Sequence, residues 1–552
     1  MSYRRIAASA AVLAAGISLV PGAAHAADPA AGKPKPHGVT APDAAKNVKP
    51  ETTTFNSPAN RSVKQAPAAG NASVAAEAAT SGIELELAAF TTSAHGMELD
   101  TVTTGTTNPV SISIEWGDGA TSQETSTGGQ TVTTAHQYGK PGGYTVKVTV
   151  TDQVTQASAV NQVAVWTRGS HYTPYGPKRL LDTRNGTGAE QGKVPAYGVT
   201  RLKIAGIDGI PEGVTSVALN VTVTNATSGG HITAYADGAE RPTTSNVNFA
   251  PGQTVPNLVI VPVGKNGYVD LYNGGWESVD LIADVTGYFT KSASSGYTPL
   301  APQRLVDTRN GTGTARGQVK GYGTFTTQVA GTGWVSSNAT AVALNVTVTN
   351  PKSDGHLTVY PSGQQAPTAS NLNFTTGQTI ANSVIVPVGP DGKITVRNGA
   401  WNPTDVIVDV VGYYSPDSAN AYVPVKPARL LDTRDGSKWA WGPLEGRGYI
   451  YMPLGNGLPH SKGFVLNSTV TNTKDNGYLA VTPDPNSLGD YENGTEIWPP
   501  TPTSSTLNWT VNKTVPNLVQ AASGPSGIID FWNQSDGNID LIVDIFGVYQ
   551  DN

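Results

Sequence analysis

Short runs in which hydrophobic and polar residues alternate recur along most of the chain. In residues 144–151, Val146, Val148 and Val150 alternate with lysine and threonine, which is the pattern of a half-buried β-strand. Turn-forming residues such as Gly117-Asp118-Gly119 separate these runs. We therefore expect an all-β protein built from many short strands.

The larger part of the chain is a threefold repeat. The motif Arg-Leu-Leu/Val-Asp-Thr-Arg begins at Arg179, Arg304 and Arg429, at two intervals of 125 residues, and each copy closes on a similar apolar strand. A unit of this length is too long for a solenoid repeat and has the usual size of a domain. We predict three tandem β-sandwich-like domains, at residues 172–290, 298–415 and 422–552.

The first 82 residues have a different composition. Arg4 and Arg5 precede an apolar stretch and the small-residue sequence Ala24-His25-Ala26, which predicts a signal peptide over residues 1–26 and hence a secreted protein. No stretch is long and apolar enough for a transmembrane helix. Residues 27–82 are rich in Ala, Pro, Lys and Thr and poor in large apolar residues, so we expect a disordered linker.

Residues 83–167 carry a distinct set of landmarks. Trp116-Gly-Asp-Gly, His136-Gln-Tyr138 and Pro141-Gly-Gly-Tyr144 follow one another in that order, and the last leads into an alternating strand that ends at Asp152. This segment resembles the PKD family, although the family's usual phenylalanine after the tryptophan is missing. The resemblance implies an Ig-like β-sandwich of the kind that serves as a spacer or as a protein- or glycan-contact module in extracellular proteins, and it does not imply catalysis.

The threefold repeat resembles an uncharacterised β domain of exported actinobacterial proteins, which carries R-L-L-D-T-R near its start and D-V-x-G-Y-F at its end. That resemblance implies export and a β fold, and it names no ligand or activity.

Each repeat closes on a carboxylate set among apolar residues: Asp284, Asp409 and Asp544. A buried carboxylate needs a cationic partner and further hydrogen bonds. We predict that the second arginine of each opening motif supplies it, so that an ion pair ties the first strand to the last. These arginines are Arg184, Arg309 and Arg434.

Other polar residues recur at equal places and are assigned to the same structural network. They are Asp182, Asp307 and Asp432; Asn220, Asn345 and Asn467; Asn248, Asn373 and Asn508; and Asn257, Asn382 and Asn517. The rival interpretation is a pocket for sugar hydroxyls or calcium, because amide and carboxylate groups bind both.

Two tryptophans follow a predicted Asn-Gly hairpin turn, at Trp276 in the first repeat and Trp401 in the second. Such a residue can present a flat apolar face on which a sugar ring stacks, or it can pack against a neighbouring loop or domain. In the third copy the turn reads Asn533-Gln-Ser-Asp536, and Trp532 comes just before it.

The third repeat also contains a net insertion of 13 residues, since Asn467 and Asn508 are 41 apart where the other copies have 28. Because loops on rigid scaffolds often carry binding specificity, this copy is the favoured place for a ligand, and a decorative loop is the alternative. The candidate ligand-binding residues here are Asp490, Tyr491, Glu492, Trp498, Trp439 and Trp441.

Composition narrows the function classes. The chain has no cysteine, which excludes thiol catalysis and disulfides, and its net charge of −6 argues against a nucleic-acid partner. No metalloprotease, serine-hydrolase or phosphate-loop motif occurs. His231 and His356 match between repeats, but Tyr478 replaces them in the third. We predict no catalytic residue, metal or cofactor.

These observations favour a secreted, non-catalytic protein that binds extracellular polysaccharide, a cell-wall polymer or a protein partner. A structural or adhesive spacer is the first alternative, and a hydrolase with an acidic site in the third repeat is the second. The sequence leaves the oligomeric state open.

Overall fold

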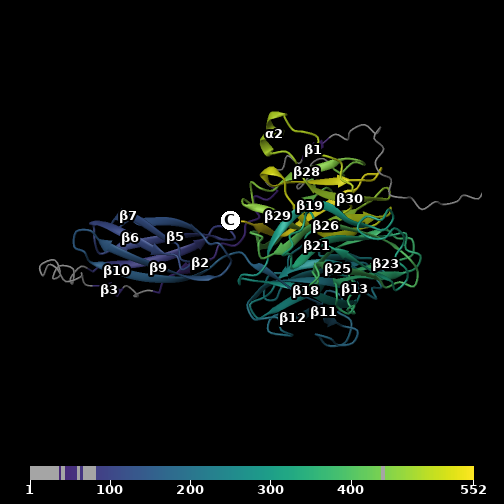
Figure 1. Cartoon of the computed structure of the whole chain (residues 1–552), viewed down its shortest axis with the longest axis horizontal. Coiled ribbons are helices and arrows are strands. Elements are labelled where there is room, and N and C mark those ends of the chain that lie inside the picture. Colours follow the sequence, from purple (N-terminus) through teal and green to yellow (C-terminus); the bar gives the residue numbers. More distant parts are fainter. Residues whose placement is uncertain (1–35, 39–43, 59–62, 66–81, 437–441, 552) are drawn as a thin grey trace, which may run out of the picture. The chain divides into compact units, whose positions relative to one another are not determined.

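The computed structural model describes residues 36–38, 44–58, 63–65, 82–436 and 442–551, and every statement below concerns these residues. Their regular secondary structure is almost entirely β-strand, which confirms the all-β prediction (Figure 1). The described helical turns are α2 (Leu488–Asn493) and the 3-10 turn η1 (Pro525–Gly527). No described helix is both long enough and apolar enough to span a bilayer.

The segment with PKD-like landmarks folds into two facing antiparallel sheets. Its apolar alternation buries one side of each sheet, and Trp116 is fully buried between them with its ring stacked on His136 at 4.5 Å. One sheet has the order β2 (Thr54–Asn56), β4 (Glu84–Thr91), β5 (Gly96–Thr104), β8 (Thr131–Gln137). The other has the order β3 (Val63–Gln65), β10 (Ser158–Trp166), β9 (Gly143–Asp152), β6 (Pro109–Glu115), β7 (Thr121–Thr127).

The segment predicted as a disordered linker differs from that prediction where it is described. Ala45 and Val48 are buried in the core of the third repeat. The strands β1 (Pro36–Gly38), β2 and β3 each add to the edge of an existing sheet. A segment poor in large side chains can be ordered in this way because an open sheet edge offers it backbone hydrogen bonds. Such bonds do not depend on the segment's own side chains.

Each repeat is a sandwich of an inner and an outer sheet, and the three copies share one topology. The inner sheets are β11 (His171–Asp182)-β18 (Asp280–Thr290)-β13 (Val214–Thr224)-β16 (Val255–Pro262), β19 (Gly296–Asp307)-β26 (Asp405–Ser415)-β21 (Ala341–Thr349)-β24 (Ile380–Pro387), and β27 (Ala421–Asp432)-β34 (Asp540–Gln550)-β29 (Ser461–Thr471)-β32 (Val515–Ala522).

The outer sheets follow the same plan, except that β1 extends the third. They are β12 (Val199–Lys203)-β17 (Tyr268–Asn273)-β14 (Gly230–Ala236)-β15 (Val247–Phe249), β20 (Thr324–Gln328)-β25 (Lys393–Asn398)-β22 (Gly355–Pro361)-β23 (Leu372–Phe374), and β1-β28 (Tyr449–Pro453)-β33 (Ile528–Asn533)-β30 (Gly477–Pro483)-β31 (Leu507–Trp509).

The closing strand of each repeat is buried on both faces and mostly apolar, apart from polar residues such as Asp284. In β18, Leu281, Ala283 and Val285 point into the sandwich of their own repeat, whereas Phe289 belongs to a second cluster shared with the other repeats. A strand covered on both sides reads as a nearly continuous apolar run. The same pattern in β26 and β34 has the same cause.

The shared cluster joins all three inner sheets, with a third of its members from each repeat. It consists of Tyr172, Ala218, Leu258, Ile260 and Phe289; Tyr297, Ala341, Ala343, Ile385 and Tyr414; and Tyr422, Val465, Leu518, Phe546 and Tyr549. The members come from matching strands, so each repeat presents the same surface to a common centre.

The three repeats therefore close into a ring with approximate threefold symmetry. The sequence predicted tandem domains of independent size, and the structure adds a core that no single repeat can complete. One polar residue enters that core: Gln520, at the place of Ile260 and Ile385, accepts hydrogen bonds from the hydroxyls of Tyr414 and Tyr549 at 2.8 and 2.9 Å.

Candidate ligand-binding site

The Arg-Leu-Leu-Asp-Thr-Arg motif forms an ion-pair cluster inside each repeat. Asp284 is buried, as predicted, but its partner is the first arginine of the motif: Arg179 Nε and Nη2 lie 2.9 and 3.1 Å from the two Asp284 oxygens. The prediction of Arg184 was wrong, since Arg184 instead makes a two-pronged contact with Asp182 at 2.8 and 2.6 Å.

Strand register explains the error. Arg179 stands directly opposite Asp284 in the β11–β18 ladder, with a bulge immediately after it, whereas Arg184 lies beyond the end of the strand. The other copies repeat these contacts. Arg304 pairs with Asp409, Arg309 with Asp307, Arg429 with Asp544 and Arg434 with Asp432.

The pKa values of the two carboxyl groups in each cluster are shifted in opposite directions. Burial raises the pKa of Asp284 despite its contact with Arg179. The hydrogen bonds from Arg184 hold the pKa of Asp182 below its ordinary value. Two arginines and two aspartates neutralise one another, so the cluster offers no surplus charge to a ligand, and its geometry fits the structural interpretation.

The recurring asparagines join neighbouring repeats. Their side chains form one amide–amide pair at each of the three contacts between repeats, and the accepting asparagine of each pair also donates to a backbone carbonyl of another repeat. The amide bonds run from Asn257 to Asn467 at 3.2 Å, from Asn382 to Asn220 at 3.3 Å and from Asn517 to Asn345 at 3.3 Å. The carbonyls belong to Ser370, Ser505 and Ser245. These asparagines are buried and fully used by the protein.

Asn248, Asn373 and Asn508 are half-buried and lie outside both networks. The residue two places earlier takes the role instead: the side chains of Asn246 and Asn371 accept backbone N–H bonds at 2.8 and 2.7 Å, and Thr506 does so in the third repeat. Sequence comparison missed these residues because the third copy replaces the amide with a hydroxyl.

Trp276 and Trp401 are the most exposed large hydrophobic residues described, at 76% and 79%. Each meets the edge of a tyrosine ring from its own repeat. Trp276 lies 5.8 Å from Tyr197, and Trp401 lies 5.2 Å from Tyr322, in both cases nearly perpendicular. We call these the Trp–Tyr pairs. In each pair the indole stays largely open to solvent while it contacts the tyrosine ring.

A buried asparagine positions the two loops that carry each Trp–Tyr pair. Asn273 Nδ2 donates to the carbonyls of Val194, Pro195 and Glu277 at 3.2, 3.0 and 2.9 Å, and its Oδ1 accepts from Gly275 N–H. These bonds fasten the tryptophan hairpin to the turn that carries the tyrosine. Asn398 makes the same bonds in the second repeat. The loops are therefore rigid before any ligand arrives.

Sequence reasoning found the tryptophans and missed their partners. Tyr197 and Tyr322 each precede a glycine in the turn before an outer strand, at an equal offset in the two copies, and this repetition was the available signal. In the third repeat Arg447 and Asp536 take the two positions and form an ion pair at 2.8 Å. Both members change together, which shows that the positions act as a pair.

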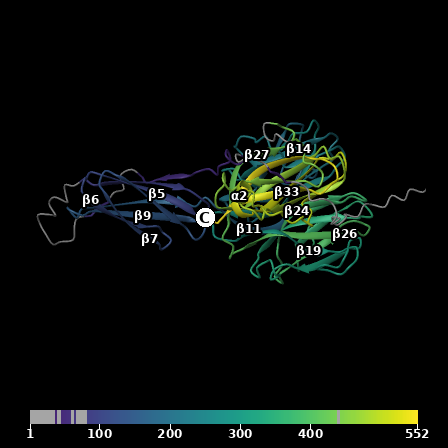
Figure 2. The same ribbon diagram turned by 90° about the horizontal axis from the view of Figure 1, so that it is seen from above.

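The inserted loop of the third repeat, which carries α2 (labelled in Figure 2), packs against β28 of the outer sheet through two aromatic contacts. Tyr491, on α2, stacks on Tyr451 at 3.8 Å, and Trp498 lies 5.6 Å from Tyr449. Asp490 caps the start of α2 through Ser487. Glu492 is exposed, and Trp439 and Trp441 lie outside the described residues. The ring faces of Tyr491 and Trp498 thus serve to seat the loop.

Beneath this loop lie two buried carboxyls, Asp484 and Asp530, which are 1% and 0% exposed. Asp484 accepts a 2.5 Å bond from the hydroxyl of Tyr491. Burial, and then the neighbouring Asp484, raise the pKa of Asp530 to about 10. Asp530 is therefore protonated at neutral pH, and the pair is sealed from solvent by the loop that it supports.

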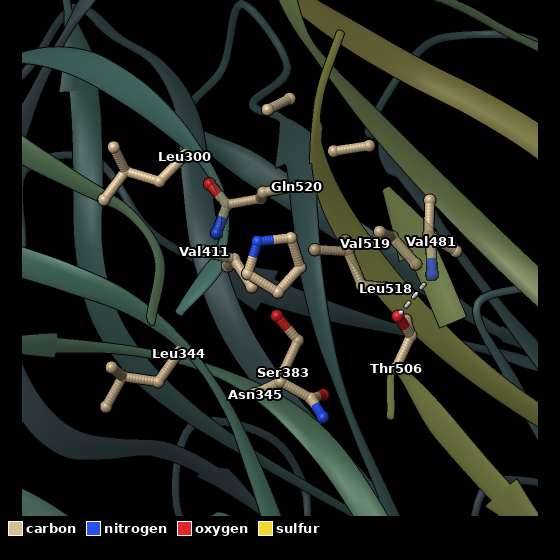
Figure 3. Close-up of a pocket in the computed structure, with 13 residues that line it drawn as sticks. Leu300, Leu344, Asn345, Ser383, Val411, Val481, Thr506, Leu518, Val519 and Gln520 are labelled. Atoms are coloured by element: carbon tan, nitrogen blue, oxygen red, sulfur yellow. Dashed lines mark hydrogen bonds between the residues drawn. The ribbon is translucent and has the colours of Figure 1, made fainter. Parts of the chain in front are cut away.

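Two cavities lie where repeats meet. The crevice in Figure 3, between repeats 2 and 3, is lined by Leu300, Leu344 and Gln520 among others and leaves about 20 Å³, room for roughly one water molecule. A wider hollow of about 1090 Å³ between repeats 1 and 3 is lined by charges of both signs, including Glu240 and Lys426. Among the described residues, no group of three acidic or histidine side chains could hold a metal ion.

Comparison with known proteins leaves the function open. No family model matches the chain, and no curated protein matches it. Solved structures with some likeness include the SusE-like protein BT2857, at 10% identity over 37% of this chain and 97% of that one, with a TM-score of 0.12. Another is the CBM22-1-CBM22-2 tandem domain from Paenibacillus barcinonensis Xyn10C, at 12% identity over 44% and 93%, with a TM-score of 0.15. Likenesses this distant carry no argument about function.

Proposed function

We propose that this protein is a non-catalytic binding protein for extracellular polysaccharide, and that the Trp–Tyr pairs of repeats 1 and 2 are its binding sites. The observation that supports this most directly is the pairs themselves. Two indole rings stand more than three quarters exposed, at matching places, each held by a tyrosine and a buried asparagine. Exposing an aromatic ring in a fixed orientation has no stabilising role in the fold.

The size and surroundings of each pair favour a sugar over a protein surface. Stable protein interfaces need about 800 Å² on each partner, and two aromatic rings offer far less. A pyranose presents an apolar face rimmed by hydroxyls, which suits one indole face with polar groups beside it. The exposed side chains of Glu277 and Asn402 follow the two tryptophans, and each tyrosine carries a hydroxyl.

The remaining parts of the chain fit the same proposal. The predicted signal peptide, which lies outside the described residues, would place the protein outside the cell. The segment that resembles PKD modules would act as a spacer. The ion-pair clusters and the asparagine pairs between repeats would hold the repeats rigid, so that the two Trp–Tyr pairs are presented in fixed directions.

The test is depletion of the purified full chain from solution by insoluble chitin, cellulose, xylan and peptidoglycan sacculi. We expect saturable binding to at least one of them, weakened at least about tenfold in the double variant Trp276→Ala/Trp401→Ala, which corresponds to about 1.4 kcal/mol. Trp334→Ala is the matched control, because Trp334 is 45% exposed and lies outside both pairs.

Failure of the wild-type protein to bind any of the four, or equal binding by the double variant and the control, would contradict the proposal. Far-UV circular dichroism of each variant establishes that the β fold is intact before binding is measured.

A further inference from the structure

The two Trp–Tyr pairs belong to different repeats and are separate surfaces. Trp276 meets only the tyrosine of its own repeat, and so does Trp401, among the ring contacts of the described residues. The ring of repeats relates one pair to the other by about a third of a turn, because each repeat contributes the same surface to the shared cluster. The pairs are therefore two equivalent sites on different repeats.

Both pairs lie away from the centre of the ring. Each tryptophan hairpin leads into the closing strand at Asp280 or Asp405, and the residue of that strand in the shared cluster is Phe289 or Tyr414, nine positions later. At about 3.3 Å per residue, the pair lies roughly 30 Å along the strand from the cluster. Each pair thus lies at the end of its own closing strand that is remote from the shared cluster.

The third equivalent position is closed to stacking. Arg447 and Asp536 occupy it as an ion pair, so the ring carries two aromatic sites and one polar substitute. The loop turns are otherwise alike, since Asn533 makes the same three carbonyl contacts as Asn273. The number of sites is set by the side chains that the common scaffold carries at this turn.

We propose that one molecule of this protein binds two separate polysaccharide segments at once and so cross-links the polymer. The inference rests on the proposed function and adds a valency to it. A molecule with two separate sites gains apparent affinity on a polymer because the second site binds at high effective concentration. The same geometry joins different polymer chains when both sites are filled.

The experiment uses the full chain and the glycan that the depletion test retains, as a hexasaccharide and as polymer. Calorimetric titration with the hexasaccharide should give about two sites per protein molecule. Trp276→Ala and Trp401→Ala should each leave about one site of unchanged affinity and weaken binding to the polymer by about 100-fold. Aggregation of polymer particles, followed by light scattering, should need both tryptophans and tolerate Trp334→Ala.

The outcomes separate the two proposals. One hexasaccharide per molecule, loss of all hexasaccharide binding in either single variant, or particle aggregation that persists in both single variants would overturn the cross-linking inference while leaving polysaccharide binding in place. Absence of hexasaccharide binding by the wild-type protein would contradict the proposed function itself.

Discussion

Replacing Arg179 with methionine should leave Asp284 as a buried carboxylate without a cation. Asp284 is 1% exposed and receives two hydrogen bonds from Arg179. Removing one partner of a buried ion pair costs about 3–5 kcal/mol, because the remaining charge keeps its desolvation penalty. The methionine fills a similar volume, so the loss measures the charge and not a cavity.

Arg184→Met is the matched control. The side chain of Arg184 is 45% exposed, and Asp182 would keep a contact of 3.2 Å with Arg179 and another of 3.2 Å with the Arg184 backbone N–H. An ion pair at such a site contributes about 1 kcal/mol or less. The two arginines of one motif should therefore differ several-fold in their effect on the free energy of unfolding.

The pH dependence provides a second check. Without Arg179 the pKa of Asp284, already raised by burial, rises further in the folded state, while in the unfolded state it stays near its ordinary value of 3.8. A group with a raised folded pKa contributes stability at low pH that is lost as pH rises. The penalty of Arg179→Met should thus be large at pH 7 and shrink toward pH 4.

Urea unfolding of the full chain, followed by circular dichroism at pH 7 and pH 4.5, measures both effects. Adding Asp284→Asn to Arg179→Met should recover most of the lost stability, because the amide carries no charge. Equal losses for the two arginine variants, or a penalty for Arg179→Met that stays constant with pH, would refute the assignment of the buried partner.

Three further changes test other parts of the structure. Asp530→Asn should raise the free energy of unfolding by roughly 2–4 kcal/mol at pH 7 and by less at pH 5. In the folded state Asp530, beside Asp484, keeps its proton up to a pKa of about 10, whereas in the unfolded state it ionises near 4. Urea unfolding at several pH values measures this, and a loss of stability at pH 7 would contradict it. Gly274→Ala should lower the free energy of unfolding by about 1–3 kcal/mol, since a Cβ there would lie 2.3 Å from the His231 ring. Adding His231→Ala should relieve this loss. A thermal melt compares the single and double variants, and equal losses with and without His231 would argue against the clash. Asn273→Asp should cost about 3 kcal/mol or more, because a carboxylate cannot donate to the three carbonyls that Asn273 fastens; if urea unfolding shows the stability of the wild type, these bonds do not build the hairpin.

The sequence correctly predicted the features that follow from the alternation of apolar and polar residues along a strand. Alternation of two fixes which side chains of a strand share a face, so the residue pattern alone assigns Val146 and Val150 to one buried face. The repeat interval likewise predicted three bodies of one topology. It could not predict how those bodies are arranged. The nearly continuous apolar run of β18 indicates that both faces of this strand are covered, but it does not identify what covers them.

The errors at the candidate sites have equally specific causes. Choosing between Arg179 and Arg184 required the β-bulge that follows Arg179, and no residue type in the motif marks a bulge. The partners of the tryptophans were missed because Tyr197 and Tyr322 occupy a turn with positive φ, 58° and 57°, where a tyrosine is not expected. Arg447 adopts 60° at the same place, so this backbone belongs to the scaffold and not to the ligand site.

The polar residue in the shared core makes one of the three repeat interfaces different from the others. The hydroxyls of Tyr414 and Tyr549 lie 2.8 and 2.9 Å from the Gln520 carbonyl oxygen and 2.6 Å from each other, and their two protons serve two of these three contacts at a time. The third equivalent position is Phe289, which brings no hydroxyl that would need an acceptor. A buried amide oxygen costs free energy unless it is paired, and it is paired only where repeats 2 and 3 meet. Among the described residues this contact distinguishes the interface of repeats 2 and 3 from the other two, at the cost of a buried Gln520 amide nitrogen that has no hydrogen-bond partner.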